Sequence, residues 1–216
     1  MSRIIIFLLL ILTAVLPVII LWLWLKKKKY SLPFFWFLTS LSAGIVSIVA
    51  AALIQNFFPG AGPSYRLSFL FFNVFIRIAL VEEGSRLLTL FPLIKAGSFK
   101  RDFGISAAMG LAAGLGFAAA ENAFYGMSNI SVTLLRFFTA APLHGACGIR
   151  SAAAVFLFPK QPVKAIFYFF SAVVIHGTYN LIIQSPAIPS ILVFPTAIAA
   201  LFISLPMIND NLDDKA

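Results

Sequence analysis

Two adjacent glutamates with an arginine close behind them are the first residues in this sequence whose types and spacing suggest chemistry. Glu82 and Glu83 are followed by Arg86, which is four residues after the first and three after the second. Side chains at these separations lie on one face of a helix, so Arg86 can neutralise one carboxylate while the other stays unpaired. An unpaired carboxylate can act as a general base. The alternative interpretation is an ion pair within one helix that only joins it to its neighbours.

Another glutamate and both histidines of the chain lie in later apolar segments. Glu121 precedes Asn122, and His144 and His176 are each followed by glycine. Two imidazoles and one carboxylate are a ligand set that zinc uses in catalytic sites, so Glu121, His144 and His176 are candidate metal ligands. Asn180 is four residues after His176, on the same helix face, and is expected to fix its ring by a hydrogen bond. Core packing is the alternative role for these histidines.

The composition indicates a protein that lies in a membrane. Of the 216 residues, 61% are hydrophobic and 11% are charged, with a mean hydropathy of +1.01. Soluble domains carry roughly 25% charged residues, and a chain of this size could not hide so much apolar surface from water. The net charge of +9 does not indicate a nucleic-acid partner, because the basic residues lie between apolar runs, where they set topology.

Seven apolar stretches predict an all-α, polytopic bundle of about seven transmembrane helices that forms one membrane-embedded domain over residues 1–216. About 20 apolar residues are needed to span ~30 Å of hydrocarbon. The stretches are Ile4–Leu25, Pro33–Phe58, Tyr65–Ile94, Phe103–Tyr125, Leu134–Phe158, Val163–Gln184 and Ile191–Ile208. The fourth is rich in glycine and alanine, which allow helices to approach closely in lipid, so it is expected to be the central helix.

The basic residues between these stretches predict the orientation of the chain. They fall in the first, third and fifth breaks, as Lys26–Lys29, as Lys95, Lys100 and Arg101, and as Lys160 with Lys164. Basic loops stay in the cytoplasm, which puts the N-terminus outside and the C-terminus in the cytoplasm.

The depths of the polar residues agree only loosely. Counted from the outer ends of their stretches, His176 and His144 lie ~12 and ~15 Å down, and Glu121 only a few residues down. Glu82 would lie ~26 Å down. Either the third helix begins above the bilayer, or it tilts strongly, or Glu121 has a different role.

The order and spacing of these residues resemble the PrsW family of membrane-embedded proteases. This family is related to the type II CAAX prenyl endopeptidases and to bacteriocin-processing membrane proteases. The matching residues are Glu82, Glu83 and Arg86, then Phe117 with Glu121 and Asn122, then His144, and finally His176 with Asn180. The family usually has lysine at the place of Arg86. Arginine there is typical of the CAAX-type relatives, whose second motif carries histidine where this chain has Glu121.

This resemblance implies an integral protein of the bacterial cytoplasmic membrane with a protease-like core at about 65–184. Its activity would be hydrolysis of a peptide bond in a single-pass membrane protein, such as an anti-sigma factor, at the start of regulated proteolysis. The lipid bilayer would be its other partner.

Two mechanisms for peptide hydrolysis stay open on the sequence, and both use Glu82 or Glu83 to deprotonate a water held with His144 and His176. In the first, the histidines and Glu121 bind Zn²⁺. In the second, which is metal-free, Asn122 or Asn180 donates to the oxyanion.

An ion- or proton-coupled transporter and a non-catalytic scaffold of the same fold are the alternative functions. Buried glutamates and histidines also carry protons, and Arg77 and Arg150 lie within the apolar stretches without a role in the protease interpretation.

Overall fold

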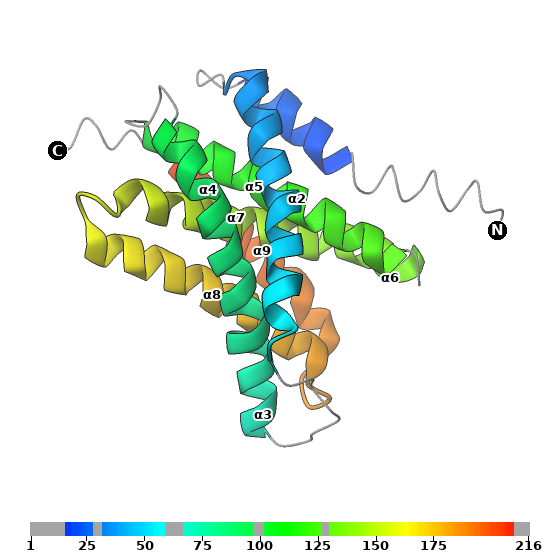
Figure 1. Cartoon of the computed structure of the whole chain (residues 1–216). Helices are drawn as coiled ribbons and strands as arrows, with labels where there is room; N and C mark the ends of the chain where they lie inside the picture. The colour runs from blue at the N-terminus through cyan, green and yellow to red at the C-terminus, as the bar shows by residue number, and fades with distance from the viewer. Residues whose placement is uncertain (1–15, 28–31, 59–66, 97–101, 127–129, 210–216) are drawn as a thin grey trace.

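The computed structural model describes residues 16–27, 32–58, 67–96, 102–126 and 130–209, and all regular elements in these ranges are helices (Figure 1). A helical segment at 16–27 comes first. The others are α2 (Phe34–Gln55), α3 (Leu67–Phe71), the π-helix η1 (Phe72–Leu80), α4 (Val81–Ala96), α5 (Phe103–Gly126), α6 (Ile130–Phe138), α7 (Ala140–Leu157), α8 (Pro162–Gln184), the 3₁₀ turn η2 (Ser190–Leu192), α9 (Val193–Ser204) and the 3₁₀ turn η3 (Leu205–Ile208). The all-α prediction is confirmed.

Four or five membrane spans are found among the described residues, fewer than the seven predicted. Four helices are long and apolar enough to cross a bilayer, at Phe34–Gln55, Phe103–Tyr125, Pro162–Gln184 and Ser190–Ile208. A fifth span results if α6 and α7, which meet at a bend of 43°, cross together.

Two predicted spans, Tyr65–Ile94 and Ile4–Leu25, are not among these candidates, each for its own reason. Tyr65–Ile94 corresponds to the consecutive helices α3, η1 and α4, whose arginines and glutamates make this stretch less apolar than the four candidate spans. Part of Ile4–Leu25 lies outside the described residues, as do most of the Lys26–Lys29 and Lys95–Arg101 breaks. The orientation of the termini stays a prediction.

Helix α5 is the central helix, as its glycines and alanines predict. In its 18-residue apolar window 83% of the residues are buried, against 33% in α2, α8 and α9. It packs mainly against α7 on one side and α2 on the other. A Cβ on Gly110 would collide with the carbonyl oxygen of Gly148 in α7, and a Cβ on Gly148 would collide with that of Gly110. The absence of side chains at both positions therefore lets the two backbones touch.

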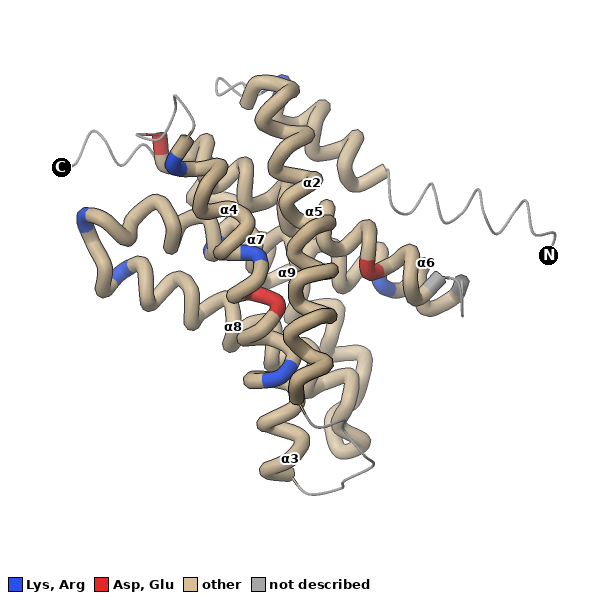
Figure 2. The backbone as a smooth tube through the Cα atoms, in the orientation of Figure 1, with Lys and Arg blue, Asp and Glu red and all other residues tan. Residues whose placement is uncertain are grey.

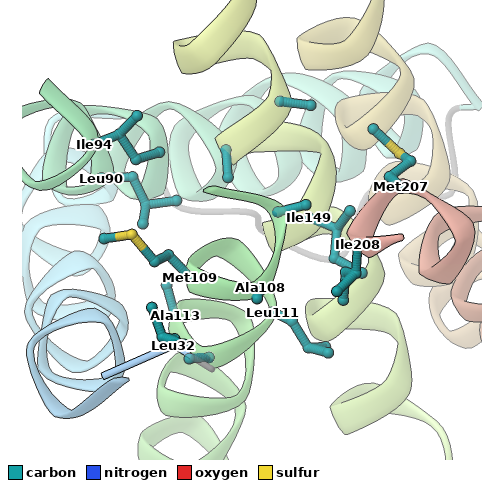
Figure 3. Close-up of a cluster of buried hydrophobic side chains, with 14 of the residues drawn as sticks. Leu32, Leu90, Ile94, Ala108, Met109, Leu111, Ala113, Ile149, Met207 and Ile208 are labelled. Carbon is teal, nitrogen blue, oxygen red and sulfur yellow. The ribbon is translucent and has the colours of Figure 1, made fainter. Parts of the chain in front are cut away.

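Buried apolar side chains form two clusters, a larger one around α5 and a smaller one among α7, α8 and α9. Figure 3 shows Leu90 and Ile94 of α4 facing Met109 of α5, with Ile149 of α7 and Met207 of η3 nearby. Large apolar side chains also cover the outside of the helices, including Phe35, Leu53, Phe167 and Phe202. Charged residues are sparse along the helices, and acidic ones lie inside the bundle as well as at its ends (Figure 2). Such a surface suits lipid.

We predict that Gly110→Ala destabilises the protein. The added methyl group would force α5 and α7 apart, at a cost of about 1–3 kcal/mol. The Tm in detergent should fall by several degrees. Gly84→Ala is the matched control, because a Cβ there meets no atom within 4 Å and alanine favours a helix. Equal Tm values for the two variants would contradict the close packing of α5 and α7.

Candidate active site

Four helices bring the predicted residues into one cluster. Glu82 and Glu83 lie in the first turn of α4, Glu121 in the last turns of α5, His144 in the first turns of α7 and His176 in α8. A Cβ on Gly114 of α5 would collide with the backbone oxygen of His144, so a small residue here allows the two helices to bring their functional groups together.

The disagreement in predicted depth has a physical explanation. Helices α3, η1 and α4 form an unbroken run of about 30 residues, ~45 Å long at α-helical rise, which exceeds the thickness of the hydrocarbon layer. Glu82 is near the middle of this run. A run longer than the hydrocarbon layer either begins outside the bilayer or tilts within it, and in both cases Glu82 can line the same pocket as Glu121 and the histidines.

Glu83 is the fully engaged carboxylate of the pair. It forms a buried ion pair with Arg86, and its Oε2 also accepts a hydrogen bond from Oγ of Ser151 at 3.2 Å. Its Oε1 lies 2.8 Å from Nδ1 of His176. With both oxygens occupied and no side-chain exposure, Glu83 holds α4, α7 and α8 together.

His176 is oriented by Glu83 and not by Asn180. Since its Nδ1 faces the Glu83 carboxylate, Nδ1 carries the proton and Nε2 points the other way, 3.6 Å from Oε2 of Glu82. The expected hydrogen bond from Asn180 is absent, and the buried Nδ2 of Asn180 has no hydrogen-bond partner among the described residues. A carboxylate 93 residues away in the sequence makes this contact, which spacing within one helix could not reveal.

Glu82 is the carboxylate that Arg86 leaves unpaired. Its Oε1 accepts a hydrogen bond from Nε2 of Gln55 in α2 at 3.2 Å, and its buried Oε2 has no hydrogen bond to the described residues. The side chain is 13% exposed, whereas that of Glu83 is completely buried. The two adjacent glutamates therefore have different environments.

His144 lies between two ion pairs, because it contacts Arg86, the partner of Glu83, and Glu121, the partner of Arg136. Arg86 donates from Nη2 to Nδ1 of His144 at 3.2 Å, and because arginine can only donate, the neutral ring carries its proton on Nε2. That nitrogen lies 2.8 Å from Oε2 of Glu121. Phe117 packs on both groups, with its ring centre 4.8 Å from the His144 ring and 4.5 Å from the Arg86 guanidinium carbon. The His144 and His176 ring centres are 4.9 Å apart.

Arg136 is a member of the cluster that the sequence patterns did not identify. It forms an ion pair with Glu121 and donates from Nε to Oδ1 of Asn122 at 3.0 Å. Its guanidinium carbon also lies 4.3 Å from the ring centre of Tyr125. The only sequence signal was its position just inside an apolar stretch. Asn122 therefore supports Arg136, which in turn holds Glu121.

A pocket of about 670 Å³ opens beside these residues. Its lining includes Glu82, Glu121, His144, His176 and Asn180, but neither Glu83 nor Asn122. The lining thus includes the Glu82 carboxylate, both histidines and the Asn180 amide, whereas Glu83 and Arg86 are buried and do not line the pocket.

The nitrogen and oxygen atoms of this cluster suit a metal ion. One atom each from Glu83, His144 and His176 lie within 4.8 Å of one another. The two histidines match the predicted ligands, and the carboxylate differs from the predicted Glu121, which is paired with Arg136. Imidazole and carboxylate are ligands that zinc prefers, and the buried Oε2 of Glu82 also makes no hydrogen bond to the described residues.

A sequence model described as PrsW family intramembrane metalloprotease matches residues 32–207, which is most of the chain and includes every residue of the cluster. Comparisons with curated proteins and with solved structures gave no match.

We predict that the two adjacent glutamates differ in their effect on stability. Glu83→Gln leaves the Arg86 guanidinium buried without its counter-charge, which costs about 3–5 kcal/mol. Glu82→Gln, the matched control, removes no ion pair with arginine and should change the free energy of unfolding by less than about 1 kcal/mol. Thermal unfolding in detergent measures both effects. A Glu82→Gln variant with the lower Tm of the two would contradict these assignments.

Proposed function

The chain belongs to the PrsW family of intramembrane metalloproteases, and we propose that it is an endopeptidase that hydrolyses a peptide bond of a membrane protein with Glu82 as general base. The observation that carries the proposal is the environment of Glu82. Its side chain lines the pocket, and its buried Oε2 has no hydrogen-bond partner among the described residues and lies 3.6 Å from Nε2 of His176.

Glu82 and His176 are suited to activate a water molecule. The 3.6 Å between Oε2 of Glu82 and Nε2 of His176 is too long for a direct hydrogen bond, and both groups can accept hydrogen bonds from one water. Glu83 keeps the proton of His176 on Nδ1, so Nε2 is available to the water. Glu82 then takes the proton as the oxygen attacks the peptide carbonyl. Gln55 holds the other carboxylate oxygen in place.

The remaining groups can serve the tetrahedral intermediate and its breakdown. Nδ2 of Asn180 is a buried donor without a partner in the described structure, so it can donate to the oxyanion. The hydroxyl of Tyr179 is less suitable, because Thr139 donates its own proton to the Leu135 carbonyl and so accepts from Tyr179. The protonated Glu82 can then give the proton that it took from water to the leaving amine, which restores its carboxylate for the next turnover.

The residues that would hold a metal ion are His144 and His176 together with the carboxylate of Glu83. When bound, a zinc ion polarises a carbonyl and makes a bound water a stronger acid. To offer Nε2 as a ligand, His144 must give up the proton that it shares with Glu121, so metal uptake is expected to release protons.

The substrate that we propose is a single-pass membrane protein, such as an anti-sigma factor, cut in the bacterial cytoplasmic membrane at the start of regulated proteolysis. The support is the family together with the pocket, which lies between apolar helices and is large enough for an extended peptide segment.

We predict that Glu82→Gln lowers the rate of cleavage of a co-expressed single-pass membrane protein about 10²–10⁴-fold, because a general base contributes that much. Asn180→Ala should lower it about 10²–10³-fold through loss of an oxyanion donor. Lys160→Gln, in the exposed turn between α7 and α8, is the control that keeps wild-type cleavage. Gel analysis of the products measures all three. Unchanged cleavage by Glu82→Gln at wild-type expression would overturn the mechanism.

We predict near-stoichiometric zinc in active wild-type protein purified without chelators, and a loss of most of it in His144→Ala and His176→Ala, because each variant removes one ligand. Elemental analysis measures the metal, and chelation followed by zinc addition should abolish and restore cleavage. Full activity of a preparation with far less than one metal ion per chain would rule out the metal ion as a cofactor.

A further inference from the structure

Arg77 is a pocket residue whose charge the proposed mechanism leaves unused. It lies on η1 and lines the same pocket as Glu82 and His176. Arg86 and Arg136 each have a glutamate partner, whereas no carboxylate in the described part of the chain pairs with Arg77. Of the pocket glutamates, Glu121 pairs with Arg136, and Glu82, whose Oε1 accepts from Gln55, forms no ion pair with Arg77 in the described structure.

The Arg77 side chain is held in place by two amides. Its Nη1 donates to Oδ1 of Asn73, one helical turn earlier, at 3.2 Å. Asn73 in turn donates from Nδ2 to Oε1 of Gln184 at the end of α8, at 2.9 Å. These contacts join η1 to α8 at the pocket wall and use one of the guanidinium nitrogens.

A second guanidinium nitrogen has no partner in the part of the chain that the structure describes. Nε of Arg77 is buried and makes no hydrogen bond to the described residues. A buried donor on a charged group is costly when it is unsatisfied, and a planar guanidinium matches the two oxygens of a carboxylate. A positioned cation with an unused donor at the wall of a peptide-sized pocket therefore indicates a site for an anionic group.

We propose that Arg77 determines specificity by binding the side-chain carboxylate of an aspartate or glutamate near the scissile bond of the substrate. This inference rests on the proposed peptidase function and names the class of substrate. An acidic side chain in the protein that is being cut is favoured over other anions, because Arg77 shares the pocket with the groups that would act on that peptide.

The test uses purified protein in liposomes of neutral lipid and a single-pass membrane peptide that the wild type cleaves and Glu82→Gln does not. Mass spectrometry identifies the cleaved bond. Each residue near it is then replaced by Glu, Gln or Lys in turn, with the C-terminus free or amidated. At one position, Glu should lower KM about 10-fold or more relative to Gln, with little change in kcat, as expected for a charge-assisted hydrogen bond.

Variants of Arg77 then assign the preference to this residue. Arg77→Gln should cleave the Glu and Gln peptides with equal KM, and Arg77→Glu should prefer Lys at the same position. Lys160→Gln, outside the pocket, should keep the wild-type ratio. Because the substrate series needs only wild-type protein, poor folding of a variant does not prevent the test.

Several results would overturn the inference while leaving the peptidase function intact. They are no preference for Glu at any position, an unchanged preference in Arg77→Gln, a preference that disappears when only the C-terminus is amidated, or cleavage that depends on added anionic lipid through Arg77 and not on the peptide. By contrast, failure to find any peptide whose cleavage needs Glu82 would contradict the proposed function itself.

Discussion

Charged groups inside an apolar helical bundle must find their partners within the protein, because lipid offers none. Arg86 meets most of this requirement at the site. It neutralises Glu83, donates to His144 and packs on Phe117, so one guanidinium fixes residues from α4, α5 and α7. Glu83 extends the network to α8 through His176. Because Glu83 already neutralises Arg86, Glu82 can line the pocket without an ion pair to an arginine.

The network can form only because the helices that carry it lie unusually close together. Gly110 and Gly148 bring the backbones of α5 and α7 into contact, and Gly114 does the same beside His144. The bend between α6 and α7 then turns the chain so that Arg136 reaches back to Glu121. Small residues and one bend thus position two ion pairs, of which Glu121–Arg136 lines the pocket and Glu83–Arg86 lies buried outside it. Stability and chemistry depend on the same contacts here, since Glu83 and Arg86 serve both.

Much of this arrangement was predictable from residue types and spacing, and the remainder depends on contacts between distant helices. Hydropathy predicts the all-α bundle, the small residues predict the central helix, and spacing shows that Arg86 can neutralise one of the two glutamates while the other stays unpaired. Spacing does not show which glutamate pairs with Arg86, because that depends on the contacts that Glu83 makes with Ser151 in α7 and His176 in α8. Depth estimates failed since α3, η1 and α4 form one long run. Arg136 has no motif, and only the bend of the chain brings it to Glu121.

The account is tested most directly by following the oxygen of water into the product. A reconstituted single-pass membrane substrate is incubated with the protein in H₂¹⁸O under single-turnover conditions, and the new carboxyl terminus is analysed by mass spectrometry. We predict one ¹⁸O atom in that terminus for the wild type, and no such product from a folded Glu82→Gln variant. Labelled product formed at the wild-type rate by Glu82→Gln, or no cleavage by a wild-type protein that instead conducts protons, would contradict it.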